Sequence, residues 1–444
     1  MATSKQSNDD DKLVYEWQVE NLVGFDPEPY GPPSRELTPY VLITPKAFEM
    51  QGYTGSMNTW ESIGEYDAKL IAGRNNLPDG AIIELEKMLI GVTDNKEKAK
   101  LIYEYVQNTT RYVSVQLGIG GWQPYDATYV YENGYGDCKA LTNYTSALLN
   151  HAGIESIYTL VNAGQGSSDI VTEFPNAHFN HAFLAVPFET DTIWLECTSQ
   201  TNPFGYTGYS TSDRHVLMTT KAGGKLVKTP TYTQKDNTQK RIATIELTKS
   251  GDAIATIETQ YAGLQYENVS RQLYESPEEQ KKWLQKKLPL VKTTITNFSY
   301  QFEPGIVPVI TENIEVTSQG YSSITGNRIF FEINPLNKLS SIPKNLKERK
   351  TEVHYKTAYT DIDSIFFTLP EGFHVEYLPE SNYIETPFGV YEAKFELTEK
   401  GINYSRKMTM KKGVYPAESY VEFRNMYKEI SKADRTKIVL VGST

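Results

Sequence analysis

The sequence predicts an α+β protein in which a helical region precedes a long β-rich region. Apolar residues recur at helical spacing from Trp60 to Leu149, and strand-like alternation dominates beyond about Lys221. Helices followed by a run of strands indicate an α+β order rather than alternating βαβ units. The 31 tyrosines also favour strands over a coiled coil.

Length, charge and cysteine content narrow the classes of protein further. The 444 residues suffice for about three domains at roughly 150 residues each. The net charge of −11 makes nucleic acid and anionic membranes poor partners, because both need clustered Lys and Arg. No apolar run approaches 18 residues, so no transmembrane segment is expected. Two cysteines exclude a disulfide scaffold and a cysteine-rich zinc site.

The N-terminal region is expected to be extended. Residues 1–12 are polar and predict a flexible leader, and the prolines within 13–54 prevent a helix. Residues 13–22 alternate as a strand does, yet no earlier stretch of the chain offers a partner strand. We therefore interpret 13–54 as the remnant of an upstream β domain, from which further sequence, including a signal peptide, has been trimmed.

Three domains are expected after this segment. Residues 55–229 predict a mixed core, 230–345 a β-rich domain with one helix, and 346–444 a C-terminal β domain that ends in a helix and a strand. The Lys-rich stretch 342–350 separates the last two. Together these two domains form a β-rich C-terminal half that we expect to be sandwich-like. No residue pattern in this half indicates a catalytic site, so its expected role is structural or in recognition.

Cys138 is the first candidate catalytic residue. It follows Gly136 and Asp137 where a turn meets the start of a predicted helix, and Asp137 is suited to be the N-cap. A helix N-terminus stabilises a thiolate, which is the reactive form of cysteine. The alternative is that Cys138 is simply a small buried residue.

His181 and Glu196 are the candidate partners of Cys138. A thiolate nucleophile needs a base beside it, and that base needs an orienting acceptor. Both residues interrupt apolar runs in two successive predicted strands, and neighbouring antiparallel strands can place them side by side. Because a buried charge without a partner is unfavourable, His181 and Glu196 are expected to satisfy one another. Cys197 should then face the core as a free, buried and unreactive thiol.

An oxyanion hole would need donors close to the thiolate. Besides the backbone N–H of Cys138, the candidates are Gln123 and Trp122 in the Gly-rich loop before the helix. Gln123 is favoured because an amide presents two donors, although loop packing explains both residues equally well.

These motifs resemble the transglutaminase-like superfamily, whose members have papain-type folds. The resemblance rests on Gly-Asp-Cys-Lys at 136–139, His-Ala at 181–182 and Trp-Leu-Glu-x-Thr at 194–198, with Arg-Tyr-Val at 111–113 and Pro-Tyr-Asp-Ala at 124–127. The resemblance covers residues 55–220 well. The chain is most similar to bacterial proteins with flanking DUF3857/DUF3858-type β domains. The resemblance implies a papain-like core with the triad Cys138, His181 and Glu196. The third residue is usually Asp, so Glu196 leaves room for an inactive site.

The expected function is thiol-dependent hydrolysis of, or acyl transfer at, a peptide or other amide bond, with hydrolysis preferred. The alternative is an inactive binding or scaffolding module of the cell envelope. No metal and no cofactor are expected, and a glycan or peptidoglycan-peptide ligand stays open. The resemblance implies export to the periplasm or cell envelope; because the first residues lack the apolar stretch of a signal peptide, a cytoplasmic location also stays open.

Overall fold

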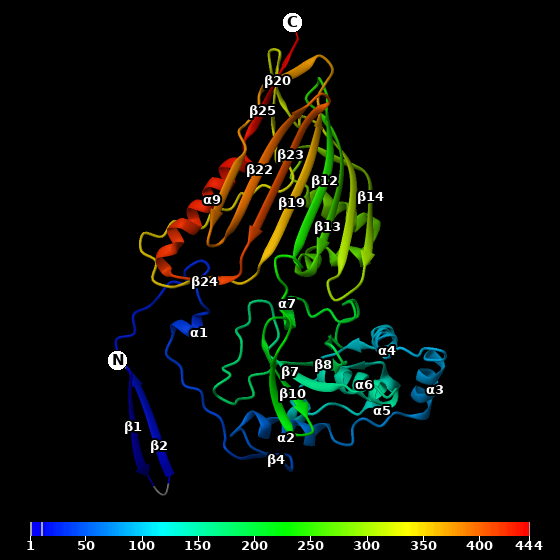
Figure 1. Ribbon diagram of the computed structural model, residues 1–444. Coiled ribbons are helices and arrows are strands. Elements are labelled where there is room, and N and C mark those ends of the chain that lie inside the picture. Colours follow the sequence, from blue (N-terminus) through cyan, green and yellow to red (C-terminus); the bar gives the residue numbers. More distant parts are fainter. Residues whose placement is uncertain (1, 10–11, 444) are drawn as a thin grey trace.

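The computed structural model describes residues 2–9 and 12–443, which form three parts (Figure 1). An N-terminal hairpin and extended segment lie beside a core of helices and strands, and a β-rich domain forms the C-terminal half. This arrangement confirms the predicted α+β class. Within the described residues, no helix combines the length and apolar character that crossing a bilayer requires.

The N-terminal hairpin differs from the sequence prediction. Strand β1 (Ala2–Asp9) pairs antiparallel with β2 (Lys12–Val19), so the second strand has a partner within the chain. The predicted flexible leader is therefore a strand over residues 2–9; residues 1, 10 and 11 lie outside the described part. Residues 4–9 are exposed and polar, and the pairing rests on the backbone. A prediction from apolar alternation cannot detect such a strand.

The segment after the hairpin is mostly extended, as the prolines predict. Its short elements are α1 (Ser34–Leu37), β3 (Phe48–Met50) and β4 (Tyr53–Gly55). Glu28 attaches the segment to the β-rich domain, since its carboxylate accepts hydrogen bonds from the backbone N–H and the hydroxyl of Thr351, at 2.8 and 2.6 Å. The ring of Tyr30 meets that of Phe423 edge-on, with centroids 4.9 Å apart.

The core contains the long helices that the sequence predicts and two short ones that it does not, α5 and α7, arranged around α6. The helices are α2 (Trp60–Ile71), α3 (Asp79–Met88), α4 (Asn95–Thr109), α5 (Ala127–Asn133), α6 (Cys138–His151) and α7 (Gly208–Thr211), with the short η1 (Gly118–Gly121). Asp94 caps α4 by accepting a hydrogen bond from the N–H of Glu97 at 2.8 Å. Nearly every residue of α6 is buried, which makes it the central helix.

A five-stranded antiparallel sheet in the order β11-β10-β7-β8-β9 packs against α6 and α2. Its strands are β7 (Ile157–Val161), β8 (His181–Pro187), β9 (Thr192–Leu195), β10 (His215–Thr220) and β11 (Gly223–Lys228). A two-residue pair, β5 (Arg111–Tyr112) and β6 (Tyr135–Gly136), lies just before α6. Because β8 and β9 are antiparallel, the start of β8 and the end of β9 meet at the same end of the sheet.

Helix α2 approaches the β10–β11 hairpin closely through glycines. A Cβ added to Gly64 would lie 2.2 Å from the backbone nitrogen of Gly224, closer than any real contact. Alanine in a helix normally stabilises it by about 1 kcal/mol relative to glycine. We nevertheless expect Gly64→Ala to lower the free energy of unfolding by about 1–3 kcal/mol in urea unfolding, because backbone would have to move.

Gly80→Ala is the matched control for this prediction. The added Cβ would meet mainly the hydroxyl of Tyr131, at 2.6 Å, which is the far end of a side chain that can move. We expect a change near zero for this variant. Equal stability of the two variants would contradict close backbone packing at Gly64.

The β-rich half is one domain, not the two that the sequence predicts. Strands β12 and β19 pair in parallel, from Thr238 opposite Thr360 to Glu246 opposite Thr368, across the expected boundary at 345/346. The sheet order is β14-β15-β13-β12-β19-β23-β22-β21. Its strands are β12 (Thr238–Leu247), β13 (Ala253–Ala262), β14 (Thr293–Glu303), β15 (Val309–Ser318), β19 (Tyr359–Thr368), β21 (Asn382–Thr386), β22 (Gly389–Thr398) and β23 (Gly401–Met410).

The β-rich half contains further elements, several of which share one hydrophobic core with the large sheet. They are the four-stranded sheet β16 (Ser323–Thr325), β17 (Arg328–Glu332), β25 (Lys437–Gly442) and β20 (Phe373–Tyr377), the pair β18 (Val353–Tyr355) and β24 (Gly413–Tyr415), helices α8 (Pro277–Lys287) and α9 (Tyr420–Asp434), and the short η2 (Gly263–Asn268), η3 (Ser270–Tyr274) and η4 (Ala417–Ser419). Phe331 of the smaller sheet packs on Phe367 of the larger one, with ring centroids 5.1 Å apart.

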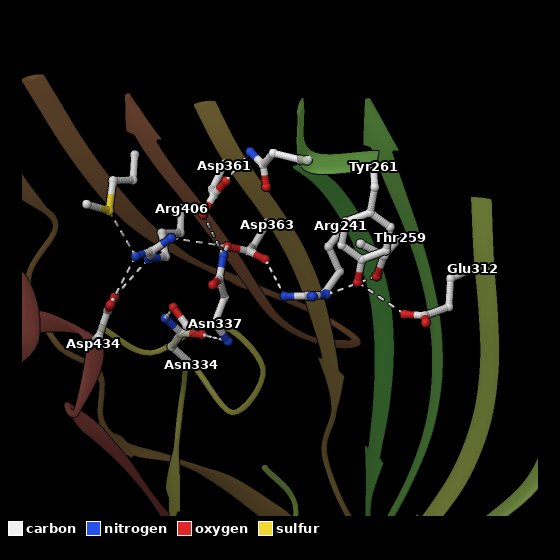
Figure 2. A network of polar contacts seen from close by, with 12 residues as sticks. Arg241, Thr259, Tyr261, Glu312, Asn334, Asn337, Asp361, Asp363, Arg406 and Asp434 are labelled. Atoms are coloured by element: carbon white, nitrogen blue, oxygen red, sulfur yellow. Dashed lines mark hydrogen bonds and ion pairs between the residues drawn. The ribbon is translucent and has the colours of Figure 1, made fainter. Parts of the chain in front are cut away.

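A buried ionic network crosses this domain (Figure 2). Arg406 on β23 donates to Asp434 of α9, Nε to Oδ1 at 2.9 Å, and lies 3.4 Å from Asp363 on β19. Arg241 on β12 reaches the other oxygen of Asp363 at 3.0 Å. The network therefore connects strands from both sides of the expected boundary, and its four side chains are at most 8% exposed.

Candidate active site

Cys138 is the first residue of α6, where the sequence predicts it. The Asp137 side chain caps the helix by accepting a hydrogen bond from the N–H of Ala140 at 2.9 Å. The free N–H groups of the first turn and the positive end of the helix dipole are therefore directed toward the region of Cys138. The residue is buried, packs against Tyr158 and Ala182, and lines a cavity of about 270 Å³.

His181 and Glu196 come together at one end of the sheet. His181 is the first residue of β8, and Glu196 directly follows the last residue of β9. The Nε2 atom of His181 lies 2.8 Å from Oε2 and 3.0 Å from Oε1 of Glu196. Thr198 donates its hydroxyl to Oε1 at 2.6 Å, which fixes the carboxylate. Since His181 also lines the cavity that contains Cys138, the three predicted residues gather in one place.

The pKa values of this pair show how strongly the two groups interact. Burial alone would lower the pKa of His181, but the Glu196 carboxylate and the Cys138 thiol outweigh burial and raise it to about 10. Burial alone would raise the pKa of Glu196, whereas His181 and the hydrogen bonds from Thr198 hold it below its ordinary value. At neutral pH the pair is therefore an imidazolium and a carboxylate.

This pair predicts a pH-dependent contribution to stability. Because the pKa of folded His181 is raised from 6.5 to about 10, its contribution is complete below pH 6.5 and is lost as the pH rises toward 10. The pKa of Glu196 is lowered from 4.5, so its contribution is complete above pH 4.5 and is lost as the pH falls through the lowered value. Both contributions are complete between pH 4.5 and pH 6.5. In this range we expect Glu196→Gln to reduce the free energy of unfolding by about 3 kcal/mol.

The measurement is urea unfolding of wild type and Glu196→Gln from pH 5 to pH 10. The difference between them should shrink as the pH approaches 10. Glu189→Gln, at an exposed position just after β8, is the matched control and should follow the wild type throughout. A constant difference across this pH range would contradict the proposed coupling.

The two oxyanion candidates occupy different places. The Nε2 atom of Gln123 donates to the hydroxyl of Tyr53 at 3.0 Å, and Gln123 does not line the cavity. Trp122 does line it, together with Gln116 from the same loop. Sequence reasoning missed Gln116, because a Gly-rich loop has no periodicity that indicates which side chains turn inward.

Asp67 and Lys139 also line the cavity and were not singled out from the sequence. Lys139 forms a buried ion pair with Asp137, the helix cap. Asp67 lies between Ile63 and Leu70 on the buried face of α2. A carboxylate within an apolar helix stripe is the sequence signal that would have identified it.

Cys197 is a free and buried thiol, as predicted. It belongs to the apolar core beneath α6. Burial, which disfavours a thiolate, raises its pKa to about 12, although hydrogen bonds with Thr145 and Thr142 act in the opposite direction. Its low reactivity stays a prediction.

The fold and these contacts define a Cys-His-Glu arrangement on a papain-like α+β core. Residues 85–198, which contain all three residues, match the family model of the Transglutaminase-like superfamily. Residues 327–440 match the domain of unknown function DUF3858. The predicted transglutaminase-like core with a DUF3858-type β region is thereby confirmed.

A solved structure has a similar fold. It comes from Parabacteroides distasonis ATCC 8503 and is described as a "putative protease". The superposition has a TM-score of 0.57 at 13% sequence identity, and covers 99% of this chain and 68% of that chain. No curated protein matches the sequence. At this identity the likeness concerns the fold, including the β-rich half.

Proposed function

We propose that the protein is a cysteine-dependent amidase or peptidase with Cys138 as the nucleophile. The observation that carries the proposal is that His181 lines the same cavity as Cys138 while its Nε2 atom is held by Glu196. The superfamily match supports the same chemistry. Glu196 is one methylene longer than the usual Asp, yet both its oxygens lie within 3.0 Å of the imidazole. The substitution therefore does not separate the pair.

In the proposed reaction, the Cys138 thiolate attacks the carbonyl carbon of an amide. The tetrahedral oxyanion accepts hydrogen bonds from the N–H of Cys138 and from the Trp122 side of the cavity. His181 gives its proton to the leaving amine as the C–N bond breaks, which leaves a thioester. Water then attacks the thioester as His181 takes a proton from the water, and the C–S bond breaks to release the carboxylic acid and to re-form the Cys138 thiolate beside the imidazolium. Glu196 keeps the imidazole oriented throughout.

Intact-mass spectrometry with a library of peptide amides tests this proposal. Wild type should cleave members of the library and show a transient acyl adduct on Cys138, whereas Cys138→Ala should do neither. Cys197→Ala is the matched thiol control and should retain cleavage. Adding a primary amine distinguishes transfer from hydrolysis, because an amide product appears only if an amine can replace water. Absence of any adduct or cleavage would favour the binding-module alternative.

A further inference from the structure

We propose that Asp67 forms a subsite for a primary ammonium group, so that the substrate carries an amine beside the reacting amide. This inference rests on the proposed function, because it concerns the cavity next to Cys138. Asp67 projects from α2 and lines that cavity together with Cys138 and His181. The chemical class of substrate is therefore a cationic peptide or amide rather than a neutral one.

The first observation is that Asp67 is buried without a counter-charge. It is 6% exposed, and its hydrogen-bond partner is the hydroxyl of Thr219, at 2.5 Å from Oδ2. Among the described residues no Lys, Arg or His nitrogen lies within 4.0 Å of its carboxylate. The nearby ammonium of Lys139 is occupied by Asp137. A buried carboxylate in this state is unfavourable until a cation reaches it.

The second observation is that two tyrosines beside this cavity have buried hydroxyl groups without hydrogen-bond partners. The hydroxyls of Tyr66 and Tyr158 are buried and have no hydrogen-bond partner among the described residues. Tyr66 lines the cavity, and Tyr158 packs against Cys138. Burial and, next, the Asp67 carboxylate raise the pKa of both tyrosines.

Together these groups match the hydrogen-bonding needs of an ammonium ion. A primary ammonium has three N–H donors, whereas a carboxylate and a phenol oxygen are acceptors. Asp67 would accept one charged hydrogen bond, and a tyrosine hydroxyl that turns toward the cavity would accept another. A neutral side chain of the same length would leave the Asp67 carboxylate without a counter-charge and the tyrosine hydroxyls without a partner. This difference is the basis for selectivity.

Peptidyl acyloxymethyl ketones that alkylate Cys138 test this inference. Three probes are compared: acetyl-Ala-Lys, acetyl-Ala-norleucine, and Ala-norleucine with a free N-terminus. The lysine probe reports a side-chain amine, and the free N-terminus reports an α-amine. We expect at least one of the two cationic probes to label wild type about tenfold faster than acetyl-Ala-norleucine, equivalent to about 1.4 kcal/mol.

Variant proteins and a change of pH complete the test. The rate at which each probe labels Cys138 is divided by the rate of iodoacetamide labelling in the same sample. Asp67→Asn should reduce the preference to below about threefold, while Glu65→Gln, an exposed carboxylate on the same helix, should retain it. Burial raises the pKa of Asp67 to about 7, although the Thr219 hydrogen bond opposes this, so the wild-type preference should be smaller at pH 5.5 than at pH 8. The other titratable groups that line the cavity are Tyr66, Cys138, Lys139 and His181, and Tyr158 packs against Cys138.

Two results would overturn the inference, and they are distinguishable. If iodoacetamide labels Cys138 rapidly but all three probes react equally, the subsite is absent and the proposed nucleophile stands. If neither iodoacetamide nor any probe labels Cys138 faster than a free thiol, the proposed function fails and the subsite fails with it. The pH comparison needs only wild type, so it decides the matter even if Asp67→Asn does not fold.

Discussion

Replacing His181 with alanine is expected to slow alkylation of Cys138 by iodoacetamide at pH 6 by about a hundredfold or more. At this pH His181 is protonated, because its pKa is raised to about 10 against the opposing effect of burial. An imidazolium next to a thiol favours the reactive thiolate, and the capped N-terminus of α6 acts in the same direction. Removing the imidazole removes the first of these two effects.

Three comparisons make this prediction specific. Glu196→Asp should keep most of the alkylation rate, whereas Glu196→Gln should lower it, because only the carboxylate favours imidazolium. His178→Ala is the matched control, since His178 is exposed and lies outside the cavity lining. Cys197 serves as an internal slow thiol, because burial raises its pKa to about 12. If His181→Ala alkylates as fast as wild type in a folded protein, the catalytic reading fails and the binding-module alternative is favoured.

The candidate triad could be predicted because each member carries a local signal. Asp137 is a capping residue before an amphipathic helix, which places Cys138 in its first turn. His181 and Glu196 are polar residues in apolar strands, and a short connection makes such strands neighbours. The structure brings them to 2.8 Å from one another. These inferences needed only patterns within about 60 residues of sequence.

The features that the sequence did not predict depend on contacts between distant segments. The parallel pairing of β12 with β19 joins residues about 120 positions apart, and nothing in either strand specifies that partner. The Lys-rich stretch 342–350 resembles a linker, yet the backbone N–H of Lys350 donates a hydrogen bond to the carboxylate of Glu28 in the N-terminal segment. Likewise, glycine contacts let α2, which carries Asp67, lie close to β11. Composition and periodicity carry no information about such approaches.

The β-rich domain also contacts the core through a segment that follows β9 and Glu196. Glu267 of η2 accepts hydrogen bonds from the Tyr206 hydroxyl and the Tyr209 backbone N–H, both at 2.8 Å. Tyr206 is almost fully buried by this contact, in a cluster with Tyr232 and Tyr266. A truncation near residue 229 would remove Tyr232 and Tyr266 and expose the ring of Tyr206. Experiments that separate the roles of the core and the β-rich domain therefore need the full chain. Destabilising the β-rich domain from within is a cleaner experiment.

Arg406→Met is expected to lower the stability of the β-rich domain by about 3–5 kcal/mol. The methionine fills similar volume, but it leaves Asp434 buried without a cation and Asp363 with Arg241 as its remaining cation among the described residues. Burial alone would lower the pKa of Arg406, and these two carboxylates raise it instead, which shows how much they favour the charged form. Asp434 also accepts the backbone N–H of Leu339 at 2.8 Å, so the loss extends to the loop before β18.

Arg328→Met is the matched control for Arg406→Met. Arg328 forms an ion pair with Glu376 at 2.5 Å, but its side chain is 47% exposed, so removing it should change stability by less than about 1 kcal/mol. Urea unfolding followed by tryptophan fluorescence and near-UV circular dichroism measures both variants, and iodoacetamide labelling of Cys138 reports the core separately. The network would not be a stabilising element if the two methionine variants unfolded at the same urea concentration. A large loss for Arg406→Met with unchanged Cys138 labelling in the native baseline would show that the buried charges stabilise the β-rich domain without setting the chemistry of the site.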